Sequence, residues 1–574
     1  MKTIIKNTNP LYCAVAKHPV TCLGVLCLLL AGVFTQGVEI TFAPTAPLVL
    51  ALTTLIAAAG VYPNPKRMMI VFLSGVLIGI SGYLLTLSSH FLPLTIAVFG
   101  SMVLVGITLV LLFTGQLTQR RGLLLLLMAG FLLRLCYVLY TTAATRQHDV
   151  WHFSVGDFLF FQNQRHAEYI EYIAANLKLP HLDPTTVGLS QLYHPPLHHL
   201  LAGLWLRLNT AFGLPYWVAV ENIQLLTLFY SSAVMVIAYR ILRFLKCKGL
   251  SLFIPFSLVV FHPTFILMAG SVNNDLLSIA LAIYALYATL RWAKNPTIKT
   301  IVPIALGIGG AMMAKLSGGM IAPAVALVFL WKWWEAIQQK NGSGKRLFWQ
   351  FVIFGLICVP LGLWWQVKNM VAFGVPLTYV PALTQNSGQY IGDCTLFERL
   401  VEVPLSSLQQ IFIVWKNQGI RAAYNEYNML LALLKSSVFG EFTLFDSTSQ
   451  MGVHQAGVLA SKILFYTNTA LIACSLCSGI VLFFKKEQRK SPSFWLFTLV
   501  WGALLLSYIR FCFAYPQTCT QNFRYAVPTL ISGCVWLGCA LKYTKNRTLQ
   551  GGAIACTLIF CLSSAVCYTL LGLV

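Results

Sequence analysis

Negative charge is scarce in this sequence. Only 16 of the 574 residues are Asp or Glu, and charged residues make up 10% of the chain against 58% hydrophobic residues. Soluble globular domains carry roughly 25% charged residues, so this balance excludes that class. The sequence also lacks heptads, internal repeats and low-complexity segments. A secondary transporter more often shows repeated halves or charged groups near the membrane midplane.

Positive charge, by contrast, is plentiful but dispersed. The 39 Lys and Arg residues give a net charge of +23 and fall in short clusters between apolar runs. This distribution is typical of the signals that orient membrane helices, whereas a nucleic-acid surface concentrates its basic residues on one soluble face. The sequence therefore predicts an all-α polytopic membrane protein with membrane lipids around it and no nucleic acid as a partner.

Apolar runs of roughly 20 residues, taken together with the positive-inside rule, predict about fifteen transmembrane helices and an extracytoplasmic C-terminus. The first run follows Lys2, Lys6 and Lys17 and lacks a small-residue cleavage site, so we interpret it as an uncleaved helix. The predicted spans are 20–36, 46–62, 67–88, 93–114, 123–142, 217–240, 251–269, 276–292, two within 300–334, 347–367, 457–483, 493–510, 527–541 and 551–573.

Two segments need a separate interpretation. Residues 196–212 are apolar, but if they crossed the membrane the cluster from Arg240 to Lys248 would lie outside, so we predict an interfacial helix that begins after Pro195 and Pro196. The long run 300–334 is interrupted at Lys315, which predicts two short spans that meet on the outer side. Asp275, at the start of the span before that run, lies at the same outer edge.

These predictions divide the chain into four regions. Residues 1–115 form an N-terminal four-helix extension, and 116–380 form a membrane module with a first outer loop at 143–199. Residues 381–455 form a second large extracytoplasmic loop with interfacial helices, and 456–574 form a C-terminal four-helix region.

The first outer loop is a polar island. Residues 146–200 hold five of the 16 acidic residues and seven of the 11 histidines. Titratable groups concentrated beside membrane helices indicate a functional site, although a solvated loop would also be polar. Asp149 could act as a general base or cap an interfacial helix. Its neighbours His148 and His152 could tune it, bind substrate or, with Asp149, ligate a metal.

Further along, His194 to His199 place imidazoles at the start of a helix, where free N–H groups favour an anion such as phosphate. We predict substrate binding by His166, His194, His198 and His199. Lys315 is either a phosphate ligand or a lysine that reaches to the interface. Arg524 is either a second phosphate ligand or a cation on a solvated loop. Asp275 is either a second acidic group of the site or the N-terminal cap of the following helix. Tyr525 could bond a polar head group.

Cysteines are numerous, with 16 in the chain, but most lie inside apolar runs, where a thiol packs as a small hydrophobe. Cys474 and Cys477 are therefore not interpreted as a metal site. Cys512 and Cys519 fall in a predicted outer loop, and their spacing suggests a local disulfide.

The order of these features resembles a known family. The chain has, in this order, an Asp after a span, an H-P-P-L helix, an inward basic turn, Asn273-Asn274-Asp275 and the break at Lys315-Leu316-Ser317. This order is similar to that in the GT-C membrane glycosyltransferases, in the branch of protein O-mannosyltransferases and aminoarabinose transferases (family 39-like). The similarity covers about 123–380, with a weaker echo at 521–525. Residues 1–115 are not part of the shared module.

The resemblance implies transfer of a sugar from a polyprenyl-phosphate carrier to a lipid, glycan or protein acceptor, at the extracytoplasmic face of the cell (inner or plasma) membrane, without a metal or other cofactor. By position, Asp149 matches the catalytic acid of the first loop and Asp275 a polar turn. The family often has a second acid beside the first, whereas Val150 follows Asp149 here. The second acid that acts with Asp149 could therefore be Asp157, Glu168 or Asp275. A carrier-lipid flippase without glycosyl transfer is the main alternative function.

Overall fold

The structure of the chain is a computed structural model. It describes residues 45–86, 92–143, 165–187, 190–339, 343–382, 385–409, 415–418, 421–440 and 455–570, together with Val25, Thr145 and Ile411. Within these ranges the regular secondary structure is helical apart from one short hairpin, β1 (Trp415–Gln418) paired antiparallel with β2 (Arg421–Asn425), and an isolated bridge between Tyr390 and Gln517.

Long apolar helices build most of the molecule. Among the described residues, ten helices are long and apolar enough to cross a membrane, and five more apolar helices are shorter. This confirms the prediction of an all-α multi-pass membrane protein, while the total of fifteen spans remains a prediction. The principal helices are α3 (Thr45–Val61), α4 (Pro65–Thr86), α5 (Leu92–Phe113), α6 (Gln119–Tyr140), α11 (Gln224–Phe244), α12 (Leu250–Phe261), α14 (Asp275–Lys294), α15 (Ile298–Ala314), α16 (Ala322–Gln338), α17 (Ser343–Phe373), α22 (Gln455–Phe484), α24 (Pro492–Ala514), α25 (Pro528–Leu541) and α26 (Arg547–Leu570).

Each predicted span within the described residues coincides with a helix to within a few residues at its ends, but two of the spans are divided into two helices. The predicted span 251–269 is divided at His262 into α12 and the short α13 (Pro263–Leu267), because Pro263 has no N–H to continue the first helix. The span predicted at 217–240 is divided into α10 (Tyr216–Glu221) and α11. The first predicted span, 20–36, lies outside the described residues apart from Val25.

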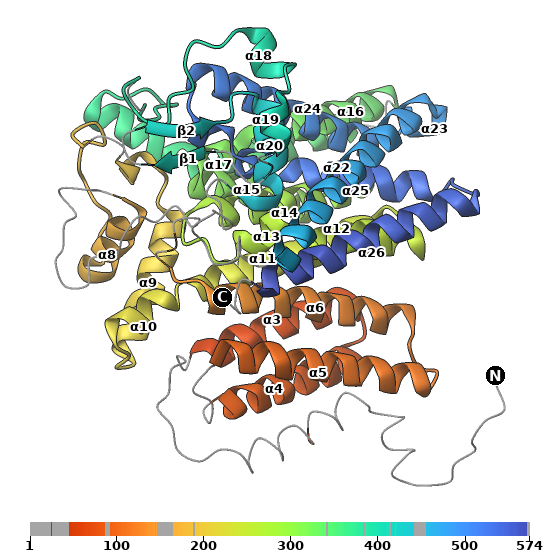
Figure 1. The fold of residues 1–574 in the computed structure, drawn as a ribbon. Helices are drawn as coiled ribbons and strands as arrows, with labels where there is room; N and C mark the ends of the chain where they lie inside the picture. The colour runs from red at the N-terminus through yellow and green to blue at the C-terminus, as the bar shows by residue number, and fades with distance from the viewer. Residues whose placement is uncertain are drawn as a thin grey trace.

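The interfacial segment forms a helix as predicted. The helix α9 (Leu197–Ala211) begins directly after Pro196 and has 15 residues, fewer than the roughly 20 that a spanning helix needs. It packs on α8 (His166–Asn176), and both lie with α10 at one end of the bundle (left in Figure 1). The break at Lys315 is also present, as the 3-10 turn η3 (Leu316–Ile321) between α15 and α16.

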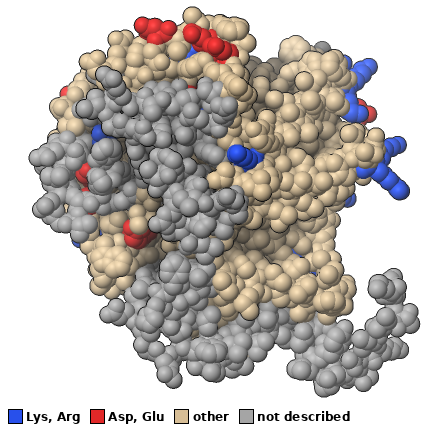
Figure 2. Space-filling view, in the orientation of Figure 1, with Lys and Arg blue, Asp and Glu red and all other residues tan. Residues whose placement is uncertain are grey.

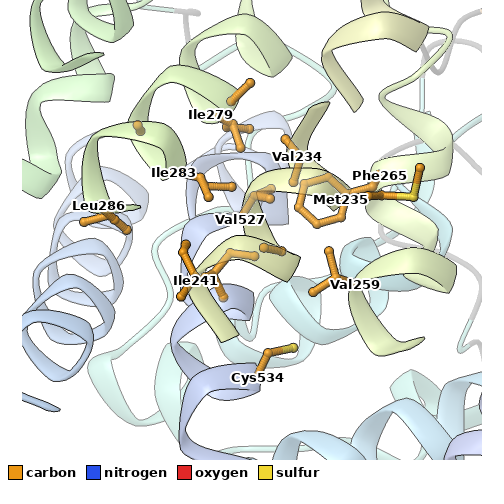
Figure 3. Close-up of a cluster of buried hydrophobic side chains, with 14 of the residues drawn as sticks. Val234, Met235, Ile241, Val259, Phe265, Ile279, Ile283, Leu286, Val527 and Cys534 are labelled. Atoms are coloured by element: carbon orange, nitrogen blue, oxygen red, sulfur yellow. The ribbon is translucent and has the colours of Figure 1, made fainter. Parts of the chain in front are cut away.

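The centre of the bundle is apolar. Side chains from α11, α12, α14 and α25 face one another there, as Figure 3 shows for Val234, Val259 and Ile283. A buried arginine, Arg134, lies within this apolar core. Arg134 of α6 donates to Ser231 Oγ and to the carbonyl oxygens of Gly130 and Val260, at 2.8, 2.9 and 2.6 Å. These bonds compensate the cost of placing a guanidinium among apolar helices.

The N-terminal helices form a layer of their own. The helices α3, α4, α5 and α6 lie side by side along one edge of the bundle (red to orange in Figure 1). Two of them join it to the rest, since α3 packs on α11 and α6 packs on α11 and α12. The N-cap of α6 is Thr118, whose side chain accepts from Arg121 N, which fixes where this helix starts.

The second large loop contains more structure than the predicted interfacial helices. Its elements are α18 (Leu396–Leu400), α19 (Leu405–Gln409), the hairpin and α20 (Met429–Phe439). The last of these packs on α13 and on the 3-10 turn η5 (Phe523–Tyr525). The disulfide predicted in the next outer loop is wrong. Cys512 is a free thiol whose Sγ lies 3.4 Å from Thr520 O.

Charge is distributed unequally between the two ends of the bundle. Lys and Arg gather at the right in Figure 2, over α23 (Lys486–Arg489) and the right-hand end of α26 in Figure 1, on the side where α16 also ends, while Asp and Glu show at the top over α18 and toward the left. The end with α8, α9 and α10 is thus opposite the basic end, as the positive-inside rule requires if α8 to α10 are extracytoplasmic.

This orientation predicts a labelling pattern. Thr186→Cys and Leu396→Cys, both at exposed positions, should react with a membrane-impermeant thiol reagent added outside intact cells. Gln339→Cys, exposed after α16, should react only after permeabilisation. Labelling is measured as the increment over the parent chain, because natural cysteines are present. External labelling at position 339 would reverse the orientation.

Candidate active site

Three charged side chains meet at one end of the bundle. Asp275 is the first residue of α14, Lys315 lies between α15 and η3, and Arg524 belongs to η5. Lys315 Nζ donates to Asp275 Oδ1 in an ion pair, and Arg524 Nη1 lies 3.8 Å from Asp275 Oδ2. The three side chains are 5 to 14% exposed, so the cluster is nearly buried.

The aromatic ring of Tyr525 lies against both cations. Lys315 Nζ is 4.9 Å and Arg524 Cζ 5.2 Å from the ring centroid, distances at which the ring face attracts a cation. Arg524 Nη2 also donates to Tyr525 Oη at 3.2 Å. The turn itself is set by Asn522, whose Oδ1 accepts from Arg524 N at 2.9 Å.

The turn before α14 is held as firmly. Asn273 Oδ1 accepts from Asp275 N at 3.1 Å, and Asn274 Nδ2 donates to Ala314 O at 2.8 Å. The second contact ties the start of α14 to the end of α15, directly before Lys315. The Asn273-Asn274-Asp275 turn and the Lys315 break are therefore one structural unit, and this unit sets the distance between carboxylate and ammonium.

A group of buried imidazoles lies beside the charged cluster. His166 Nδ1 and His199 Nε2 share a hydrogen bond of 2.8 Å, and the rings of His166 and His194 are 5.4 Å apart. Burial lowers the pKa of His194 well below its usual value, and the neighbouring His166, Lys315, His199 and Arg524 side chains, which would repel a proton on it, lower it further. His194 is therefore neutral at pH 7, so it can form hydrogen bonds but carries no charge of its own.

His198 has a different surrounding. Its Nε2 donates to Val272 O at 2.6 Å, which leaves Nδ1 as an acceptor. Burial lowers its pKa to about 4, against the opposing effects of the bond to Val272 and the charge of Asp275. Among the described residues, His198 Nδ1 and the hydroxyl of Tyr169 have no hydrogen-bond partner. Such buried polar atoms are costly unless a ligand or water satisfies them.

The structure brings together most of the residues predicted from the sequence. Asp275, Lys315, Arg524 and Tyr525 form the charged cluster, and His166, His194, His198 and His199 form the imidazole group beside it. Asp149, Asp157, His148 and His152 lie outside the described residues. Within the described part of the chain, no three His, Cys, Asp or Glu side chains are grouped as a metal site.

The sequence analysis did not identify Tyr169, which packs against the imidazole group. Tyr169 stacks on His199 with centroids 4.2 Å apart and is fully buried. Its position three residues after His166 on α8 was a usable signal, since residues three apart lie on one helical face. By contrast, Asp183 lies on an exposed turn away from this group, where its Oδ1 accepts from Thr185 N at 2.8 Å.

Comparisons with known proteins add little to this geometry. No family model matches the chain, and no curated protein matches it by sequence. Among solved structures, the chain is similar to the apo crystal structure of the Archaeoglobus fulgidus oligosaccharyltransferase, with 13% identity and a TM-score of 0.42. The match covers 79% of this chain and 56% of that one, so it spans about half of that protein's length. A likeness at this level decides neither fold nor function.

The fold and the site themselves define a class. The chain is an all-α multi-pass membrane protein with a nearly buried cluster of charged and imidazole side chains at the end of its bundle opposite the basic end.

Proposed function

We propose that this protein is a membrane glycosyltransferase of the GT-C type, which moves a sugar from a polyprenyl-phosphate donor to an acceptor at the extracytoplasmic face of the cell membrane. The observation that carries the proposal is the convergence of Lys315 and Arg524 on one carboxylate and one aromatic ring at the end of an apolar bundle. A lipid-linked phosphate has matching parts, an anionic head at the boundary and a hydrocarbon tail in the membrane.

The proposed reaction is a direct displacement. A hydroxyl oxygen of the acceptor attacks the anomeric carbon of the sugar, the bond from that carbon to the phosphate oxygen breaks, and the polyprenyl phosphate leaves with the electron pair. Asp149 takes the proton of the attacking hydroxyl as general base. Lys315 and Arg524 stabilise the negative charge that develops on the departing phosphate.

In this scheme Asp275 positions the two cations. Its carboxylate holds Lys315 by Oδ1 and faces Arg524 by Oδ2, so both donors are already directed before substrate binds. Preorganisation of this kind lowers the cost of reorienting the groups during the reaction. The imidazoles of His194 and His199 supply neutral hydrogen-bonding groups beside the phosphate or the sugar.

Lys315→Ala is expected to weaken donor binding by about ten- to a hundredfold, because one charge-assisted hydrogen bond to phosphate contributes about 1.5–3 kcal/mol. The apparent donor requirement should rise more than turnover at saturation falls, as measured with purified protein over a range of donor concentrations. Lys315→Arg should restore part of the loss.

Lys332→Ala is the matched control, since Lys332 also forms an ion pair, with Glu335 on α16 at the basic end of the bundle. It should leave the donor requirement unchanged. If Lys315→Ala lowers only the folded yield, with the same donor dependence in the folded fraction, Lys315 is structural. Absence of covalent transfer by the purified protein, with binding of the carrier lipid retained, would favour the flippase alternative.

A further inference from the structure

The N-terminal layer contains a partly open cavity that the proposed reaction does not use. It has a volume of about 1020 Å³ and is bounded by α3, α4, α5, α6 and the first turn of α11. Small-molecule sites typically measure about 300–1,000 Å³, so this cavity has the size of a full ligand site. The residues that line α5 run from Ile96 to Leu111, about 22 Å of helix at 1.5 Å per residue.

Most of the cavity wall is hydrocarbon, and the surrounding surface is too. Leu50, Ile78, Val103 and Leu132 line the interior, while the opposite faces of α4 and α5 expose large apolar side chains: Met69, Ile70, Leu73, Ile80, Val98, Met102, Val105 and Leu109. Ile70 belongs to both surfaces, so the cavity opens beside the lipid-facing surface. The cavity therefore lies at membrane depth, where hydrocarbon chains are the abundant ligand.

One end of the cavity has the opposite character. Arg67, Arg120 and Arg121 line it together with Tyr62. The three guanidinium groups place positive charge at this end of the cavity. The connection from α5 to α6 lies at the right in Figure 1, on the same side as α23, and therefore at the basic end of the bundle.

These arginines have no acidic partner in their own part of the chain. The sequence contains no Asp or Glu from Ile40 to His148, and the segment before it has only Glu39. Arg121 donates to the backbone and side-chain oxygens of Gln116, at 2.8 and 2.7 Å, which are neutral. Charge complementarity therefore favours an anion from outside the N-terminal region.

We propose that this cavity binds one membrane phospholipid with an anionic head group, its phosphate at Arg67, Arg120 and Arg121 and an acyl chain between α3, α4, α5 and α6. An apolar slot with cations at one mouth matches the two parts of such a lipid, and juxtamembrane basic residues attract anionic lipids at the basic face of a membrane protein. The site is distant in sequence from Asp275 and Lys315, and the inference does not depend on glycosyl transfer.

Gly79 offers a direct way to close the cavity. A side chain added there would meet only Leu50 Cδ1, at 3.8 Å, whereas one at Gly75 would fall 2.3 Å from Thr54 Cγ2. Gly79→Phe should therefore fill the slot without separating α3 from α4. Gly502→Phe on α24 is the matched control, because nothing lies within 4 Å of that position.

The test uses full-length protein in detergent, with native mass spectrometry of bound phosphatidylglycerol and phosphatidylcholine carrying the same acyl chains. Phosphatidylglycerol should bind more tightly. The variant Arg67→Gln/Arg120→Gln/Arg121→Gln should lose about a hundredfold in affinity for it, because each basic residue near an anionic head contributes about fivefold. Gly79→Phe should exclude both lipids, while Gly502→Phe and Lys486→Gln/Lys490→Gln, at exposed positions of the basic end, should change nothing.

Four results would overturn the assignment. Equal binding of the two lipids, or an unchanged affinity in the triple variant, would show that the arginines do not select an anion. Preferential retention of an isoprenyl phosphate over phosphatidylglycerol would make the occupant a carrier lipid. A disulfide between Gly79→Cys and the natural Cys27 in lipid-free protein would show that the apolar segment 20–36 of this chain fills the slot.

Discussion

Asp149→Asn is expected to lower turnover by about 10²–10⁴-fold, the usual cost of removing a general base. The amide keeps the shape of the side chain and most of its hydrogen bonding, but it cannot accept the proton of the attacking hydroxyl. Donor binding should survive nearly unchanged, because a carboxylate repels the donor phosphate if it acts on it at all. Single-turnover kinetics with saturating donor, together with a donor-binding measurement, separate the two effects.

Asp183→Asn is the matched control. Asp183 accepts from the backbone N and the hydroxyl of Thr185, at 2.8 and 2.7 Å, in an exposed turn of the same loop, so its loss should cost far less than tenfold. A folded Asp149→Asn protein that keeps more than about a tenth of the parent turnover would remove Asp149 from the mechanism. Asp157 and Asp275 would then be the next candidates.

Lys435→Met is expected to destabilise the protein by about 3–5 kcal/mol, the typical cost of leaving one member of a buried ion pair without its partner. Lys435 Nζ lies 2.7 Å from Glu426 Oε2, and both side chains are 0% exposed. The measurement is thermal or denaturant unfolding of the detergent-solubilised protein. The double variant Glu426→Gln/Lys435→Met should recover a large part of the loss, because it removes both charges.

This ion pair also supports the candidate site. Gln521 Nε2 donates to Glu426 O, and Phe523 N donates to Ser436 Oγ at 2.9 Å, so α20 and the preceding turn hold η5 in place. Loss of the pair should therefore impair donor binding through Arg524 as well as stability. If the double variant is as unstable as the sum of the two single variants, the pair contributes through packing instead of charge.

Local sequence patterns predicted the elements that position the site. The length of the apolar runs identified the membrane helices, and Pro195-Pro196 marked the start of α9 because proline fits the first turn of a helix. Lys315, together with Gly318 and Gly319, marked the break between α15 and α16. Each of these signals involves residues that are only a few positions apart, so a single sequence is enough to detect it.

The contacts within the site were beyond such signals. Lys315 and Asp275 are separated by 40 residues, and Arg524 comes from a turn near the far end of the chain. Their meeting depends on how whole faces of α14, α15 and η5 pack, and no periodicity along the chain encodes that packing. The same limit applies to Glu426 and Lys435, because a spacing of nine residues does not place two side chains on one face of a helix or of a strand.

The sequence by itself determined that this is an all-helical membrane protein, which of its ends is basic, and which residue types supply charge on the other side, because hydrophobic length and charge asymmetry are properties of the chain alone. Only the tertiary structure decided that Lys315 and Arg524 share one carboxylate, that His166 pairs with His199, and that α3 to α6 leave a cavity with arginines at its mouth. The physical reason is that apolar helices can pack in many arrangements that bury a similar amount of apolar surface. The arrangement that forms is selected by the fit of their side chains and by the need to satisfy every buried polar group.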